Sequence, residues 1–335
     1  MKTASRIALT IDLSHPGKQT GDAMLRWSDN TNPLGYHPIP VVSIKGQDGP
    51  VLLLTGGTHG DEFEGPSAIM RVLHSVKASE LRGQIIAFPA LNMPAFVASS
   101  RVSTLDGGNL NRAFPGDRDG SATQMIAHFL ETDILPRCDA AIDLHSGGKA
   151  SVFQSCALPT HTADPVLADR NMDLARAFGL PLIWRLGAHN DNRSVNSAAE
   201  RAGVPMIAAE LGGGGGVDPG NTDAAETGIR NILWHLGMLD GEVERSAQPR
   251  VVELRDPAAS LYATGEGLFD RALTAGQSVS ARDEAGWFHY VTEPERASVR
   301  LTVAADGLVL AHTNRGLVRR GELLLLVVQD VDQAL

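Results

Sequence analysis

Between residues 51 and 238, short apolar runs alternate with longer amphipathic stretches, and this alternation limits the possible folds more than any other feature. Apolar runs of strand length, separated by segments of helical length, are typical of a parallel sheet whose strands are connected by helices. We therefore predict an α/β fold with a largely parallel sheet flanked by helices. The predicted strands are 51–54, 84–89, 140–144, 151–156, 181–184 and 205–209, and the predicted helices lie near 65–78, 121–135, 165–178, 193–202 and 222–238.

The two ends of the chain have a different pattern. Residues 1–50 indicate irregular structure or antiparallel β, with turns rich in Asn, Asp, Gly and Pro. After the polar segment 240–249, residues 250–330 contain short apolar stretches separated by glycines and no long helical pattern. This pattern is typical of a small all-β domain, barrel-like or sandwich-like. We predict an α/β domain over 1–245, which includes the N-terminal β segment, and a small β domain over 246–335.

Composition and charge exclude several classes of protein. The formal net charge of −10 over 335 residues argues against a nucleic-acid or anionic-membrane partner. Cys138 and Cys156 are the only cysteines, so a disulfide framework is not expected and a reducing compartment fits. The N-terminal residues lack an apolar core of signal-peptide length, and no stretch approaches the ~20 apolar residues that span a bilayer. We expect a cytoplasmic protein, and the sequence leaves its oligomeric state open, a homo-oligomer included.

Polar side chains follow four of the predicted strands. His59, Asn92, His145 and Glu210 each come just after an apolar run, where the carboxyl ends of parallel strands form binding sites. His59 and Glu62 lie three residues apart in a glycine-rich turn, and imidazole and carboxylate are both good ligands for Zn²⁺. A catalytic zinc takes three protein ligands and keeps one position open, so the rest of the chain should supply a third ligand.

His145 is the candidate for that third ligand. It follows the apolar run 140–144 and precedes Gly147 and Gly148, which allow close approach of the backbone to a ligand. Asp143 is two residues earlier, on the same face if the strand continues, and could accept the other imidazole N–H. The remaining histidines lack such neighbours and fit ordinary surface or core positions.

The sequence also contains candidates for a general base and for a substrate-binding group. Glu210 ends an apolar strand, where desolvation raises the pKa of a carboxyl toward a value useful for proton transfer. The glycine run 212–216 after it leaves the surroundings of Glu210 open, although a flexible linker is the simpler reading of such a run. Asn111 and Arg112 lie in a loop bounded by Gly and Pro, and Arg suits bidentate recognition of a carboxylate.

The order and spacing of these motifs resemble the succinylglutamate desuccinylase/aspartoacylase family, which is related to the zinc carboxypeptidases. The resemblance covers about residues 40–240 and is greatest to the bacterial branch of N-α-acetyl-2,4-diaminobutyrate deacetylases. The motifs are Gly-Gly-Thr-His-Gly-Asp-Glu-Phe-Glu-Gly at 56–65, Pro-Ala-Leu-Asn at 89–92, Leu-Asn-Arg-Ala-Phe-Pro-Gly-Asp at 110–117, Asp-Leu-His-Ser-Gly-Gly at 143–148 and Glu-Leu-Gly-Gly-Gly-Gly at 210–215.

The resemblance implies a zinc-carboxypeptidase-like fold, with a mixed, largely parallel sheet and a C-terminal domain like a barrel-sandwich hybrid. It implies hydrolysis of the amide bond of an N-acyl amino acid, N-acetyl-diaminobutyrate among the candidates, to a carboxylic acid and a free amino acid. The implied roles are binding of one Zn²⁺ by His59, Glu62 and His145, general base and acid catalysis by Glu210, polarisation of the scissile carbonyl by Arg101, and binding of the substrate α-carboxylate by Asn111 and Arg112.

Two other functions remain open from the sequence. The same zinc apparatus could serve a carboxypeptidase that acts on peptides, and a panel of peptides and N-acyl amino acids would separate the two. A binding protein without catalysis on the same fold is the second alternative. The intact set of ligands, base and substrate-binding residues argues against it, because a degenerate site has usually lost at least one of them.

Overall fold

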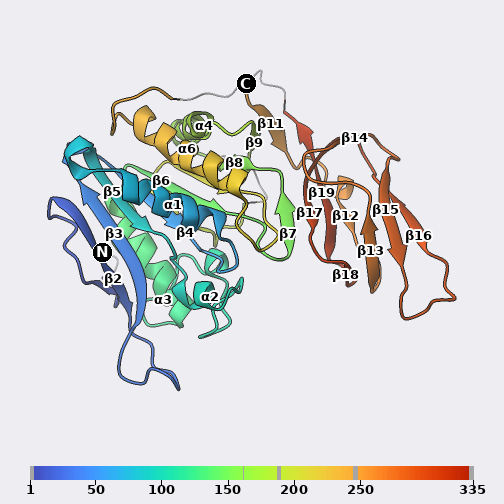
Figure 1. Ribbon diagram of the computed structural model, residues 1–335, viewed down its shortest axis with the longest axis horizontal. Coiled ribbons are helices and arrows are strands. Elements are labelled where there is room, and N and C mark those ends of the chain that lie inside the picture. The colour runs from blue at the N-terminus through green and yellow to red at the C-terminus, as the bar shows by residue number, and fades with distance from the viewer. Residues whose placement is uncertain (1–3, 161, 187–189, 244–247, 332–335) are drawn as a thin grey trace.

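The computed structural model describes residues 4–160, 162–186, 190–243 and 248–331. Within these residues, one long sheet runs from the N-terminal β segment into the C-terminal part of the chain (Figure 1). Its strands in spatial order are β1 (Ala8–Leu9), β2 (Gly17–Leu25), β3 (His37–Lys45), β5 (Arg82–Phe88), β4 (Gln47–Gly56), β6 (Ala140–His145), β10 (Met206–Glu210), β8 (Cys156–Pro159), β9 (Leu182–Trp184), β11 (Arg250–Glu253), β19 (Leu323–Asp330), β17 (Gly307–Thr313) and β14 (Ser278–Val279), with β12 (Leu261–Tyr262) on β19 and β7 (Ser151–Phe153) on β17.

The centre of this sheet is parallel, as predicted. β5, β4, β6 and β10 pair in parallel with one another, while β1, β2 and β3 add an antiparallel edge. Both faces of the central strands are buried: Leu52 and Leu54 enter one hydrophobic cluster and Leu53 enters the opposite one. Burial on both faces explains why these strands are continuous apolar runs and do not alternate between apolar and polar residues.

Helices cover both faces of the central strands. α1, α4 and α6 pack on one face (Figure 1), and the hydrophobic cluster on the other face contains residues of α3 and α5. The side chain of Asp218 caps the first turn of α6 and Pro219 occupies its first position, so α6 begins three residues before the predicted residue 222. The helices are α1 (Glu64–Ser75), α2 (Met93–Val97), α3 (Ala122–Phe129), α4 (Pro165–Phe178), α5 (Val195–Ala202) and α6 (Pro219–His235), and α3 continues through a π-helical turn at Leu130–Ile134 and a 3₁₀ turn at Leu135–Arg137.

The predicted strand 151–156 is two strands with different partners. β7 pairs antiparallel with β17 of the C-terminal part, whereas β8 pairs antiparallel with β10 of the central sheet. The prediction of one continuous strand was wrong because an apolar run carries no signal of which neighbour each half will pair with. The chain crosses from one partner to the other within residues 154 and 155.

The described C-terminal residues form short β-strands and no α-helix, as predicted, with one 3₁₀ turn at Pro257–Ala259. A second antiparallel sheet contains β16 (Val299–Thr302), β15 (Glu284–His289), β13 (Gly267–Arg271) and β18 (Leu317–Val318), and it shares a hydrophobic core with β17 and β19. The predicted domain boundary between residues 245 and 246 lies outside the described residues and stays a prediction. Among the described residues, no helix is long and apolar enough to cross a membrane.

Tight packing between α4 and α6 gives a test of this core. A Cβ on Gly228 would lie 2.5 Å from Cζ of the buried Phe178 ring. We expect Gly228→Ala to lower the free energy of unfolding by about 1–3 kcal/mol through overpacking, although alanine is the better helix former by about 1 kcal/mol. Gly220→Ala in the first turn of α6 is the control, because its nearest atom is 3.4 Å away. Urea denaturation compares the variants, and equal stability would contradict the packing.

Candidate functional site

The loop between β4 and α1 places His59 and Glu62 at the carboxyl edge of the sheet. Gly57 adopts a φ of +62°, which turns the chain away from β4. At Gly60 a Cβ would lie 2.0 Å from the backbone carbon of Ala95, so only glycine fits this position. The Gly60 N–H donates to the carbonyl of Ser100 at 3.0 Å, which fixes the loop against the segment after α2.

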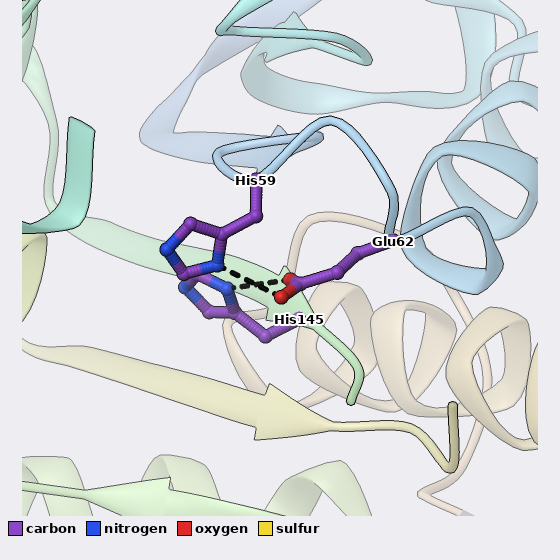
Figure 2. Close-up of side chains that lie close together, drawn as sticks. All are labelled: His59, Glu62 and His145. Atoms are coloured by element: carbon purple, nitrogen blue, oxygen red, sulfur yellow. Dashed lines mark hydrogen bonds and ion pairs between the residues drawn. The ribbon is translucent and has the colours of Figure 1, made fainter. Parts of the chain in front are cut away.

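Two imidazoles and one carboxylate meet at this edge (Figure 2). Nδ1 of His59 lies 2.8 Å from Oε1 of Glu62, and Nδ1 of His145 lies 2.9 Å from Oε2 of the same carboxylate. All three side chains are buried, and their candidate ligand atoms lie within 4.8 Å of one another. In the part of the chain that the structure describes, this is the one group of three or more His, Cys, Asp or Glu side chains that could hold a metal ion.

The members of this cluster set one another's pKa values. Burial would raise the pKa of Glu62, but His59 and His145 outweigh this effect and hold the pKa far below its usual range. Burial lowers the pKa of His59, because desolvation disfavours the charged imidazole. Burial also acts to lower the pKa of His145, but Asp143 and Glu62 overcome it and hold the pKa well above its usual value. The cluster therefore holds an ionised carboxylate, a neutral imidazole and a proton on His145 that a metal ion would displace.

Each imidazole is oriented by an oxygen on its other side. Oδ2 of Asp143 lies 2.6 Å from Nε2 of His145, and Oδ1 of Asp143 accepts hydrogen bonds from the hydroxyls of Thr55 and Thr58. Oδ1 of Asn109 lies 3.2 Å from Nε2 of His59. The structure thus brings the predicted partner Asp143 to His145 and adds Asn109, which sequence reasoning missed because 50 residues separate it from His59.

Glu210 lies beside this cluster at the end of β10. It is directly opposite His145 in the register of the parallel strands β6 and β10. Its Oε2 atom is buried and has no hydrogen-bond partner among the described residues. Burial, and then the negative charge of Glu62, raise the pKa of Glu210 to about 8. This is the raised pKa that the sequence predicted for a carboxyl at a desolvated strand end.

The glycine run after Glu210 is bound to the neighbouring loop, contrary to the open surroundings expected from the sequence. The Gly147 N–H donates to the Gly212 carbonyl at 3.0 Å, and the Gly214 N–H donates to the Gly148 carbonyl at 2.7 Å. Positive φ angles at Gly212 to Gly215 and close contacts permit this course. At Gly213, for example, a Cβ would lie 2.3 Å from the carbonyl oxygen of Ser151.

Of the predicted arginine and asparagine residues, one contacts the cluster and the others contact neighbouring segments. Arg101 reaches it directly, with Nη1 3.4 Å from Oε1 of Glu62 and its side chain 48% exposed. Oδ1 of Asn111 accepts the N–H of Val195 at 3.0 Å. Nε of Arg112 lies 3.1 Å from Oδ2 of Asp191, so its guanidinium is already paired with an acid of this chain. Asn92, the other residue predicted at a strand end, contacts the loop that carries His59: its side chain donates to the carbonyl of Thr58.

Comparisons with known proteins agree with this geometry. Residues 48–236 match the model of the succinylglutamate desuccinylase/aspartoacylase catalytic domain. The chain is 34% identical to the N-alpha-acetyl-L-2,4-diaminobutyric acid deacetylase of Halomonas elongata, over 98% of this chain and 96% of that protein.

Two solved structures are similar over almost the whole chain. A succinylglutamate desuccinylase/aspartoacylase from Rhodobacter sphaeroides has a TM-score of 0.92 and 35% identity, over 98% of this chain and 100% of that one. The product-bound ectoine utilization protein EutE (DoeB) from Ruegeria pomeroyi has a TM-score of 0.94 and 32% identity, over 98% of this chain and 99% of that one.

The fold, the buried cluster and these relatives define an amidohydrolase of the deacylase type. More narrowly, the chain belongs to the succinylglutamate desuccinylase/aspartoacylase family. The resemblance read from the motifs is confirmed, and so is the predicted fold class.

Metal binding at this cluster should depend on pH, because His145 must lose its proton to become a ligand. Its raised pKa means that the apparent affinity for Zn²⁺ should fall as the pH drops below that pKa, by about tenfold per pH unit for one displaced proton. Competition with a chelator of known affinity, at a series of pH values, measures this dependence.

His145→Ala should abolish this binding, whereas His74→Ala, at an exposed position on α1, should leave it intact. An affinity that did not change with pH would contradict a protonated His145. Full zinc occupancy of the His145→Ala protein in elemental analysis would contradict the cluster as the metal site.

Proposed function

We propose that this chain is a zinc-dependent deacylase that hydrolyses the amide bond of an N-acyl amino acid and releases a carboxylic acid and a free amino acid. The observation that carries the proposal is the position of Glu210, which lies opposite His145 in the sheet and has a buried Oε2 atom beside the cluster of His59, Glu62 and His145. A proton-transfer group beside three candidate metal ligands is the combination that metal-assisted amide hydrolysis requires.

The donor set fits zinc. Two imidazole nitrogens and one carboxylate are a common ligand set of catalytic zinc sites, which leave the fourth position open for water or substrate. The contacts at 2.8 Å and 2.9 Å show that both Nδ1 atoms already face the Glu62 carboxylate without any rotation of the rings. A zinc ion at such a site lowers the pKa of a water molecule and polarises a carbonyl. Asp143 would keep His145 in the orientation that presents Nδ1.

Glu210 is suited to move the proton in both halves of the reaction. A carboxyl with a pKa near 8 is close to the operating pH, where both its forms are accessible. Its buried Oε2, which lacks a partner among the described residues, is free to accept a proton from the attacking water. The same oxygen can return this proton to the nitrogen of the departing amino acid.

Arg101 and the pair Asn111–Arg112 would act on different parts of the substrate. Arg101 lies within 3.4 Å of Glu62, so a carbonyl oxygen bound at the cluster would be near its guanidinium. A fixed positive group at that point stabilises a developing oxyanion and is typically worth about 10²-fold or more in rate. Asn111 and Arg112 would hold the α-carboxylate and so place the amide bond against the cluster.

The Halomonas relative suggests the first substrate to test. Its name specifies an acetyl group on the α-nitrogen of 2,4-diaminobutyrate, and the identity extends over 98% of this chain. We therefore propose N-α-acetyl-2,4-diaminobutyrate as a candidate substrate, with acetate and diaminobutyrate as products.

A hydrolysis panel tests the function. With zinc-reconstituted protein, we expect turnover of N-acyl amino acids, with N-α-acetyl-2,4-diaminobutyrate among the best, and little or no turnover of peptides of similar size. Release of the free amino acid is measured by chromatography. Faster cleavage of peptides from their carboxyl end would replace this proposal with a carboxypeptidase, and no hydrolysis of any compound by the zinc-loaded protein would reject catalysis of this kind.

Replacement of Glu210 separates proton transfer from metal binding. Glu210→Gln should keep its zinc and reduce kcat by about 10²–10⁴-fold, because an amide cannot accept the proton. Glu80→Gln, a change of the same kind at an exposed position, should leave kcat unchanged. Steady-state kinetics and metal analysis on the same samples give both readouts. A Glu210→Gln protein that hydrolyses the substrate at the wild-type rate would show that another group is the base.

A further inference from the structure

Asp191 lies between two arginines next to the proposed substrate-carboxylate site. Its Oδ2 lies 3.1 Å from Nε of Arg112 and 2.9 Å from an Nη atom of Arg193. Its Oδ1 accepts the backbone N–H of Arg193 at 2.9 Å and the Nε–H of the same residue at 3.0 Å. The Asp191 side chain is 24% exposed, compared with 42% for Arg112 and 60% for Arg193, so the acid is the most enclosed of the three groups.

The segment around Asp191 also supports Asn111. The Val195 N–H, at the start of α5, donates to Oδ1 of Asn111 at 3.0 Å. The Phe114 N–H donates to the Arg193 carbonyl at 3.1 Å. Ser194 caps α5 by accepting the N–H of Ser197, so these donors and acceptors belong to an ordered helix start. The loop that carries Asn111 and Arg112 is therefore held by residues 191–195 at three separate points.

These contacts restrict the guanidinium of Arg112 to one orientation. Nε faces Asp191, and Nη1 donates to the backbone carbonyl of Asn111 at 2.6 Å. A free arginine side chain loses much conformational freedom when it binds a ligand, and fixing it beforehand removes most of that cost. Arg112, Arg193 and Asp191 together still carry one net positive charge, so the site keeps its attraction for a carboxylate.

We propose that Asp191 is a positioning residue that orients Arg112 for the carboxylate of the substrate. Asp191 makes no contact with the reacting atoms and acts only through the arginine. The inference rests on the proposed function, because it concerns the same carboxylate site. The hydrogen bond from the Arg193 side chain is the main cause that lowers the pKa of Asp191 to about 2, with desolvation acting in the opposite direction, so the acid is charged at neutral pH.

The contact between Asp191 and Arg112 could also weaken substrate binding. An acid beside Arg112 also competes with the substrate carboxylate for the guanidinium. If that competition were its main effect, removing the charge would strengthen substrate binding. The direction of the change in KM therefore decides between positioning and competition.

Asp191→Asn tests the proposal on the zinc-loaded enzyme. We expect KM for the best N-acyl amino acid of the panel to rise by roughly 5- to 20-fold with little change in kcat, because the arginine acts in binding and not in bond cleavage. Asp191→Glu, which keeps the charge, should recover part of the loss. Asp173→Asn removes an exposed acid of α4 and should leave both constants at their wild-type values.

An analogue with a carboxamide in place of the α-carboxylate is the sharper control. Its kcat/KM should be the same in wild type and Asp191→Asn, whereas general damage to the fold would lower it in the variant. A double-mutant cycle with Arg112→Lys should be non-additive, because both changes remove one interaction. A fall of KM in Asp191→Asn, an equal loss for the carboxamide, or additive effects would each overturn the proposal.

Failure of this inference differs from failure of the proposed function. If the wild-type protein hydrolyses N-acyl amino acids but Asp191→Asn keeps the wild-type KM, only the role of Asp191 is wrong. If the wild type hydrolyses none of them, the same double-mutant cycle measured by urea denaturation still tests the Asp191–Arg112 contact. Additive effects on stability would then show that the pair does not interact in solution.

Discussion

The parallel pairing of β4, β6 and β10 is the constraint on which the rest of the site depends. In register, Gly56 of β4 lies opposite Leu144 of β6, and His145 of β6 lies opposite Glu210 of β10. Because the three strands point the same way, their carboxyl ends reach one edge of the sheet together. Side chains separated by about 150 positions in the chain thereby become neighbours. The hydrophobic clusters on the two faces hold the strands in this register, so packing far from the site determines its geometry.

Burial at that edge determines the pKa values and the strength of the polar contacts in the site. The same exclusion of water that raises the pKa of Glu210 makes the contacts between Glu62 and the two imidazoles strong. Buried charges are costly unless they are paired, and here each ring has an oxygen on both sides. The site is thus a network in which changing one member alters the protonation of the others.

Loops around the cluster are tied to one another and to the C-terminal β structure. Oδ2 of Asp61 accepts the N–H of Lys149 at 2.9 Å, which links the His59 loop to the segment after His145. On its other side, that segment pairs through β7 with β17, and the side chain of Asn314 donates to the Lys149 carbonyl. Preorganised groups of this kind need not rearrange during a reaction. The C-terminal β structure therefore contributes to the order of the site, although it supplies none of the proposed ligands.

The amino-acid sequence by itself determined the elements and the chemical inventory. Apolar runs with helical spacers predicted the parallel sheet because strands buried on both faces must be continuously apolar, and glycine-rich turns after those strands marked His59, His145 and Glu210. Tertiary structure alone decided that residues 151–156 form two strands with different partners and that the glycine run is bound to the neighbouring loop. It also decided that Asn109 contacts His59 and that Asp191 pairs with Arg112. These facts concern which distant segments meet. Contacts between distant segments depend on how the whole chain packs in three dimensions. The periodicity and local spacing of residues in the sequence do not predict them.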